Sequence, residues 1–190
     1  MEATGVALAT TRRGRPAALA ALGVGLAYAA ISMYWALGGT WLLDTVGIAL
    51  SRPGQAGHAI ALAAALGAAV LKAVAAVLPV LAVLRIRVRP GGGQDRGLNR
   101  LIRVLAWIEA AILLGYGLIY TAAGLLVQAG LVHAPAHADH LASRWHAYLW
   151  DPWFGVWGIL VFTALYRSRP GRSGSGRSGS GRSRQAPVPG

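Results

Sequence analysis

Long apolar segments alternate with short charged stretches along this chain of 190 residues. The charge-free runs are 16–43, 53–71, 110–138 and 152–166. A helix that crosses a bilayer needs about 20 mostly apolar residues; the first three runs reach or approach that length, and the fourth is shorter. The pattern predicts an all-α fold, a four-transmembrane-helix bundle with spans at about 16–38, 58–84, 101–129 and 149–166.

Composition and charge support a membrane protein. Hydrophobic residues make up 55% of the chain and charged residues 13%, whereas soluble domains carry about a quarter charged residues. The absence of cysteine excludes disulfides, thiolate metal sites and cysteine nucleophiles. The net charge of +12 is distributed in blocks between the apolar runs. This distribution is typical of the signals that orient membrane proteins, and it argues against nucleic acid as a partner.

The two ends of the chain are polar. Residues 1–15 form a basic lead, and residues 168–190 repeat Gly, Arg and Ser. This tail is predicted to be disordered, because it has no apolar surface to bury. Its arginines are expected to be solvated, to attract anionic lipid headgroups at about 1 kcal/mol per basic residue near the surface, or both. A signal peptide cleaved near Ala29 is the alternative to a retained first span, but the apolar run continues well past that residue.

The basic residues favour one orientation. The lead, the segment 85–103 and the residues from 167 onward carry fifteen arginines, whereas the two other connecting segments carry one each, Arg52 and Arg144. Arginine and lysine collect in the cytoplasmic loops of membrane proteins. The sequence therefore predicts a multi-pass protein of the plasma membrane with both termini in the cytoplasm.

One charged residue, Lys72, interrupts the second apolar segment. It lies 13 residues before Arg85, so it is about 20 Å above the inner boundary of the bilayer. A charge near the bilayer centre costs about 2.5–3.5 kcal/mol and normally faces protein or water. Small residues such as Ala69 and Ala76 share its side of the helix. The opposite side carries Leu66, Val70, Val74, Val77 and Leu81. Lys72 is therefore predicted to face the other helices.

The third span carries Glu109, Tyr116 and Tyr120 on one line, because spacings of seven and eleven residues return to the same side of a helix. Glu109 lies closer to the inner boundary than the two tyrosines. Depth along the helices makes Tyr116 and Asp151 the expected partners of Lys72.

Asp151 opens the predicted fourth span and is followed by Pro152, an order typical of a helix N-cap followed by the first helical residue. Capping and an inward-facing role are compatible. The candidate polar pocket, in the outer half of the bundle, comprises Lys72, Asp151, Tyr116, Tyr120, Glu109, Ser32 and Trp35. The alternative is an internal hydrogen-bond network that fixes helix packing, a common use of polar residues in membranes.

Three histidines of the second outer loop, His133, His137 and His140, are spaced by four and three residues. On a helix this spacing would align their imidazoles for zinc or copper. Pro135 weakens any helix there, so solvated loop histidines are the default expectation. No cofactor is expected.

Two motifs carry a resemblance. Tyr34-Trp35-Ala36-Leu37-Gly38-Gly39 ends the first span, and Trp150-Asp151-Pro152-Trp153-Phe154 opens the fourth. In these motifs the chain resembles a family of small bacterial four-helix membrane proteins of unknown function. The resemblance implies a four-span membrane domain and supplies no catalytic residues.

The functional expectation is a non-enzymatic membrane protein that binds a small solute or a lipid headgroup in the outer pocket. The alternative is a scaffold or interaction subunit that partners another membrane protein. A small transporter or an intramembrane enzyme has less support, because the sequence shows no internal repeat and no metalloprotease or serine-hydrolase motif.

Overall fold

The computed structural model describes residues 14–46, 55–84, 93–133 and 139–169, and all regular elements within them are helical. The all-α prediction is confirmed. The elements are α2 (Arg15–Ala36), the 3-10 helix η1 (Leu43–Val46), α3 (Gln55–Leu84), α4 (Gly93–Gln128), α5 (His140–Trp145), the π-helical turn η2 (His146–Trp150) and α6 (Asp151–Arg167).

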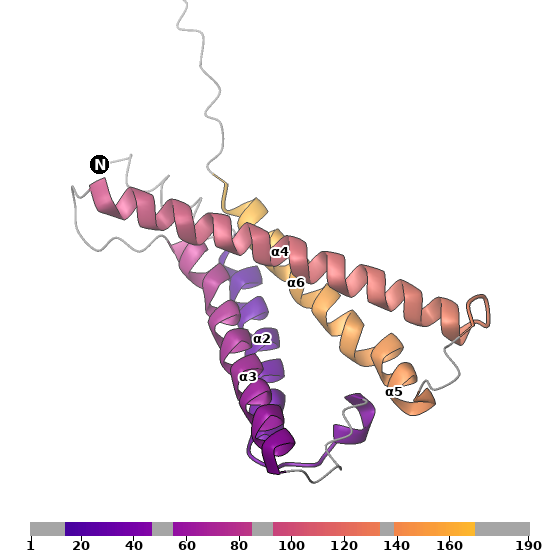
Figure 1. The fold of residues 1–190 in the computed structure, drawn as a ribbon. Helices are drawn as coiled ribbons and strands as arrows, with labels where there is room; N and C mark the ends of the chain where they lie inside the picture. Colours follow the sequence, from indigo (N-terminus) through magenta and orange to yellow (C-terminus); the bar gives the residue numbers. More distant parts are fainter. Residues whose placement is uncertain (1–13, 47–54, 85–92, 134–138, 170–190) are drawn as a thin grey trace, which may run out of the picture.

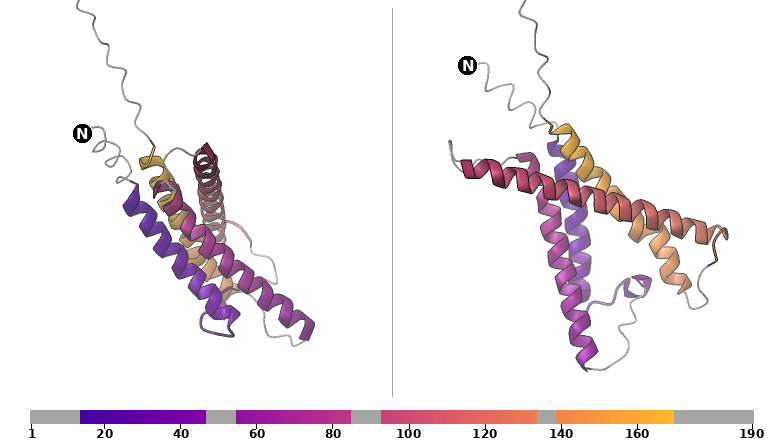
Figure 2. Two further views of the ribbon diagram at one scale, coloured as in Figure 1. Left: turned by 90° about the vertical axis from the view of Figure 1, so that its left-hand side faces the viewer. Right: turned by 45° about the horizontal axis from the view of Figure 1, so that its top comes forward.

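The helices form two pairs, α2 with α3 and α4 with α6 (Figure 1). The pairs meet at the end of the molecule that holds the start of α2 and the end of α6, and they diverge toward the other end (Figure 2). Contacts between α2 and α6 join the pairs. Gly14 packs so closely on Ala164 and Ser168 that a Cβ on Gly14 would collide with the Ala164 carbonyl oxygen. The beginning of α2 and the end of α6 therefore lie at the same end of the bundle.

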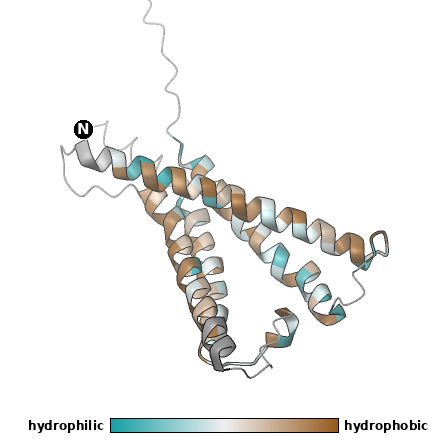
Figure 3. Cartoon of the chain, in the orientation of Figure 1, coloured by the Kyte–Doolittle hydropathy of each residue, from teal (hydrophilic) through white to brown (hydrophobic). Residues whose placement is uncertain are grey.

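Three helices are long and apolar enough to cross a membrane: Arg15–Ala36, Leu62–Leu84 and Gly97–Gln128. Hydrophobic residues dominate their middle parts, and polar residues gather near the beginning of α4 and in α5 (Figure 3). On α3 the large residues predicted to face lipid, among them Leu66, Val70 and Val74, are exposed, whereas Ala69 and Ala76 are buried. Leu81 is an exception, because it packs against the hydrophobic core.

Glycines bring α4 and α6 together. A Cβ on Gly117 would collide with the backbone of Gly155, and a Cβ on Gly158 would lie 2.7 Å from the backbone nitrogen of Leu114. Apolar side chains gain little from burial against each other in lipid, so membrane helices associate through such close packing of small residues. The buried cluster that follows this seam includes Ala106, Ala110, Leu113, Trp157 and Val161.

The first of the two motifs, residues 34–39, ends α2 with a Schellman cap. Gly38 has a φ of +91°, a conformation that glycine adopts without steric cost. Its N–H donates to the Trp35 carbonyl, and the N–H of Gly39 donates to the Tyr34 carbonyl. These bonds satisfy carbonyls that the end of a helix leaves free. Gly130, with a φ of +72°, ends α4 in the same way.

The fourth helical segment is longer than predicted. It begins at His140 and not near residue 149, and the side chain of Asp139 caps it by accepting hydrogen bonds from the N–H groups of Leu141 and Ala142. Asp151 is therefore not the N-cap that the sequence suggested. The motif of residues 150–154 lies inside the helical run, where the turn η2 precedes Pro152 and the N–H of Asp151 donates to the His146 carbonyl.

The α4 helix also extends beyond its predicted span, since it begins at Gly93 and not near residue 101. A helix need not end where the apolar residues end, because its polar first turns remain stable in water. Arg103, close to the start of the predicted span, donates to the Leu165 carbonyl at 3.0 Å and to the Ser168 hydroxyl at 3.2 Å. It thereby supplies hydrogen-bond donors to polar groups at the C-terminus of α6. Its positive charge also interacts favourably with the negative end of the helix dipole.

The predicted tail begins two residues too early. Ser168 is buried and Arg169 stacks on aromatic rings, so both belong to the folded part. The remainder, residues 170–190, lies outside the described residues, as do 1–13, 47–54, 85–92 and 134–138.

Replacing Gly117 with alanine is expected to lower the free energy of unfolding by about 1–3 kcal/mol, because the added methyl group would force α4 away from α6. Gly115→Ala is the matched control, since a Cβ there meets nothing within 4 Å. That change should be neutral or stabilising by about 0.5–1 kcal/mol. Unfolding in detergent measures the stability of both variants. Equal free energies of unfolding for Gly117→Ala and Gly115→Ala would contradict the close packing of α4 on α6.

Candidate functional site

Lys72 lies between α3 and α2. Its ammonium group donates to the Ser32 hydroxyl at 2.7 Å and sits 3.9 Å from the centroid of the Tyr28 ring. Ser32 and Tyr28 are one turn apart on α2, and both are buried. The small residues of α3 let the two helices approach, so that the lysine reaches across from α3 to α2. A hydroxyl and an aromatic face thus hold the charge inside the bundle.

The Tyr28 ring also belongs to an aromatic cluster. Its centroid lies 5.7 Å from Trp150, 5.9 Å from Trp153 and 4.8 Å from Phe154, all contributed by the fourth helical segment. Trp35 packs edge-on against Trp150 at 5.5 Å. These rings link α2 and α6 where the two pairs of helices diverge. Tyr28 therefore couples the lysine on α3 to the fourth helical segment.

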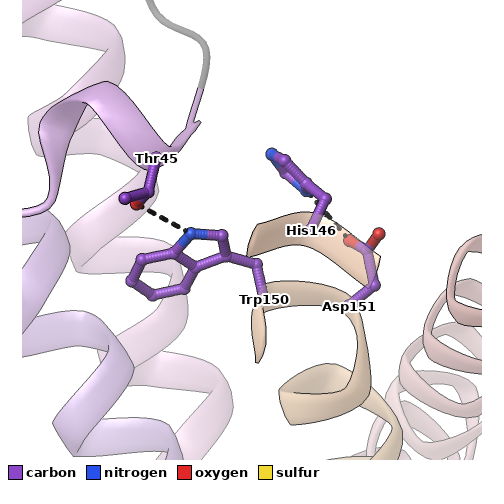
Figure 4. Close-up of polar contacts among 4 residues, drawn as sticks. All are labelled: Thr45, His146, Trp150 and Asp151. Atoms are coloured by element: carbon purple, nitrogen blue, oxygen red, sulfur yellow. Dashed lines mark hydrogen bonds and ion pairs between the residues drawn. The ribbon is translucent and has the colours of Figure 1, made fainter. Parts of the chain in front are cut away.

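Two polar contacts fix the turn η2 within this cluster (Figure 4). The fully buried Trp150 donates its indole N–H to the Thr45 hydroxyl at 3.1 Å, which ties η1 to the bundle. On the same turn, Nδ1 of His146 lies 3.2 Å from Oδ1 of Asp151, a carboxylate that is 4% exposed.

The turn η2 makes the contact between His146 and Asp151 possible. Residues five apart on a regular α-helix point about 140° away from each other. Here five residues are wound into one turn, which places the imidazole above the carboxylate. The turn that precedes Pro152 thereby also sets the partner of Asp151.

Tyr116 and Tyr120 extend the cluster onto α4. Their rings stack at 4.4 Å, and Tyr116 also packs edge-on against Phe154 at 5.0 Å. Asp151 lies close enough to interact electrostatically with both Tyr116 and Tyr28. The ammonium group of Lys72 and the carboxylate of Asp151 therefore both belong to this cluster, and each has its own polar partner, Ser32 and His146 respectively.

Glu109 has a different environment. Both of its carboxylate oxygens are buried without a hydrogen-bond partner among the described residues. It lies seven residues from Tyr116, about 10 Å along α4 and nearer the end where the helix pairs meet. Glu109 therefore does not belong to the aromatic cluster around Tyr28.

The structure brings together most of the predicted residues but pairs them differently. Lys72 contacts Ser32 and Tyr28 instead of the expected Asp151 and Tyr116. Trp35 joins through Trp150. The sequence analysis did not assign roles to Thr45, Trp150 and His146. The sequence did offer one signal for these residues. Trp150 and Asp151 stand next to each other in one motif, which indicated a contact between the fourth helix and the first two helices.

The proposed metal ligands are not assembled among the described residues. His133 and His140 are both exposed, and His137 lies outside the described part of the chain. Within that part, no group of three histidine, aspartate or glutamate residues has a geometry that could hold a metal ion.

The Lys72–Ser32 contact is expected to appear as an energetic coupling between the two residues. Ser32→Ala should lower the free energy of unfolding by about 1–3 kcal/mol, because it removes the acceptor of a half-buried ammonium group. Lys72→Met in the same chain should restore much of that loss, since no charge between the helices is then left without its acceptor. A double-mutant cycle in detergent measures the coupling. Strictly additive effects would contradict the contact.

Comparison with known proteins identifies a family and no activity. Neither a curated protein nor a solved structure matches the chain. The model of a family described as "Protein of unknown function (DUF3995)" matches residues 25–161, a range that contains both motifs and the residues of the outer cluster. Because this match covers more than half of the sequence, the chain belongs to that family of proteins of unknown function.

Proposed function

We propose that this protein crosses the plasma membrane four times, with both termini in the cytoplasm, and acts as a non-enzymatic binding protein. Its ligand is a small anionic solute or an anionic headgroup, bound in the outer half of the bundle. The residues that carry the proposal are Lys72, Ser32 and Tyr28, with Tyr116, Tyr120, Trp35 and Asp151 around them.

The observation that carries the proposal is the incomplete set of partners around Lys72. An ammonium group has three N–H donors, and one of them donates to Ser32 while the charge lies over the Tyr28 ring. Within the described residues, Asp151 has His146 as its polar partner, and the contacts of Lys72 are with a hydroxyl and a ring and not with a carboxylate. A charge at this depth costs about 2.5–3.5 kcal/mol. A bound anion would offset that cost.

The orientation is supported by geometry and by charge. The start of α2 and the end of α6 lie together, which agrees with an even number of crossings. The four-span arrangement would put the fifteen arginines of the lead, the middle loop and the C-terminal segment on that side, in agreement with the preference of arginine for cytoplasmic loops. Anionic lipid headgroups on the same side are the proposed partners of the tail from residue 170 onward.

A scaffold or interaction subunit is the second candidate. The observation in its favour is that 17% of the span window of α4 is buried within the chain, against 33% for α2. The large exposed surface of α4 suits another membrane helix as well as it suits lipid. One stoichiometric protein partner in a pull-down, with no effect of anions on stability, would favour this function.

Reporter fusions test the orientation. A fusion after Arg96 and one at the C-terminus should report the cytoplasm, and a fusion near Ala138 should report the outside. A cytoplasmic signal near Ala138 would rule out the four-span arrangement.

Anion binding should stabilise the purified protein. Phosphate, acetate and glycerol phosphate are the probes, and glycerol phosphate represents a lipid headgroup. A ligand at about 100 times its Kd adds about 2.7 kcal/mol to the free energy of unfolding. The gain should vanish in Lys72→Met and persist in part in Lys72→Arg, which keeps the charge. An equal gain in the wild type and in Lys72→Met would place the anion elsewhere and contradict the site.

A further inference from the structure

A second group of residues with binding chemistry lies at the opposite end of the bundle, where the helix pairs meet. The guanidinium group of Arg169 is 4.9 Å from the centroid of the Trp107 ring on α4 and 5.1 Å from that of Tyr166 on α6. Phe162 packs edge-on against Trp107 at 5.4 Å and stacks on Tyr166 at 6.0 Å. We call Trp107, Phe162, Tyr166 and Arg169 the Arg169 platform. It bridges the outer surface of the α4–α6 seam.

Stacking leaves the guanidinium group able to bind an anion. The flat face of an arginine side chain packs on rings, while its N–H groups point outward in the plane and fit two phosphate oxygens. Arg169 is exposed, and so is Arg100. Arg100 lies seven residues before Trp107, so both project from the same side of α4.

The end of α6 does not repel an anion at this position. A helix C-terminus carries a partial negative charge. Arg103 neutralises it here by donating to the Leu165 carbonyl and the Ser168 hydroxyl. The charge of Arg169 therefore remains available for a ligand.

Below the platform the surface of α6 is apolar and open. Phe162 is 43% exposed and Ile159 is 52% exposed, and both lie on the same side of α6 as Tyr166. Tryptophan and tyrosine concentrate at the level of the lipid headgroups in membrane proteins. A basic group, an aromatic belt and an apolar strip follow one another in the order in which a phospholipid presents its phosphate, its glycerol backbone and its acyl chain.

We propose that the Arg169 platform binds an anionic phospholipid of the leaflet at this end of the bundle. The phosphate lies against the guanidinium of Arg169, with Arg100 adding charge, and an acyl chain follows Phe162 and Ile159. This inference rests on the proposed membrane placement but not on anion binding at Lys72, which lies at the other end of the cluster of helices.

Lipid retention tests the platform. The full chain is reconstituted in nanodiscs of phosphatidylcholine with phosphatidylglycerol as the minor lipid, extracted, and examined by native mass spectrometry for bound lipid. The wild-type chain should retain phosphatidylglycerol in preference to phosphatidylcholine. Arg169→Gln should reduce that preference about fivefold, the factor that corresponds to about 1 kcal/mol for one basic residue. Tyr166→Leu, which removes one ring from beneath the arginine, should also reduce it.

Arg167→Gln is the matched control. It removes the same charge from the same end of α6, but the guanidinium group that stacks on Trp107 and Tyr166 is that of Arg169. It should keep the preference. Arg169→Gln should lower the preference by the same factor in a chain that already carries Lys72→Met, which separates this site from the proposed function. Equal losses in Arg167→Gln and Arg169→Gln would overturn the proposal, because they would indicate diffuse attraction to charge. So would equal retention of the two lipids by the wild-type chain, or retention of free phosphate in place of phosphatidylglycerol.

Discussion

The constraint on which the structure depends is that lipid offers no hydrogen bonds to a peptide backbone. Every N–H and carbonyl inside a bilayer must find its partner within the protein. Both sequence motifs serve the backbone hydrogen bonding of the helices. Residues 34–39 close the end of α2 through the N–H groups of Gly38 and Gly39. Residues 150–154 hold a proline within a helical run, preceded by a π-helical turn. The side chain of Arg103, on α4, likewise donates to a backbone carbonyl at the end of α6, that of Leu165.

The π-helical turn has consequences beyond the backbone. It brings His146 over Asp151, and it places Trp150 where its ring reaches Tyr28, Trp35 and Thr45. A regular helix through the same residues would turn these side chains in other directions. The aromatic connection between α2 and α6, and through Tyr28 the position of Lys72, therefore depends on the local geometry around one proline.

The parts of the fold that the sequence predicts are those governed by solvation. Long apolar runs, the small-residue side of α3 and the glycine after α2 each depend on local chemistry, and the structure agrees with them. The partner of Lys72 could not be predicted in this way. Depth counted along the helices puts Tyr116 and Asp151 level with the lysine, but it does not say which helix lies beside α3. That helix is α2, so the ammonium group meets Ser32 first. Asp139 was overlooked as a cap because Pro135 and the alanines around it obscure the start of the helix.

The placement of the charged side chains bears on whether the outer cluster serves only for packing. A structural network would be expected to pair its ammonium group with a carboxylate, since each unpaired charge in a bilayer is costly. In the described residues Lys72 is held by a hydroxyl and a ring and Asp151 by a histidine, so the two side chains have different partners. If the cluster served only for packing, apolar residues in place of Lys72, Asp151 and His146 would fill the same space at a lower free-energy cost. The separation of opposite charges is what a binding site requires, because a lysine already paired with a carboxylate has little affinity left for an anion.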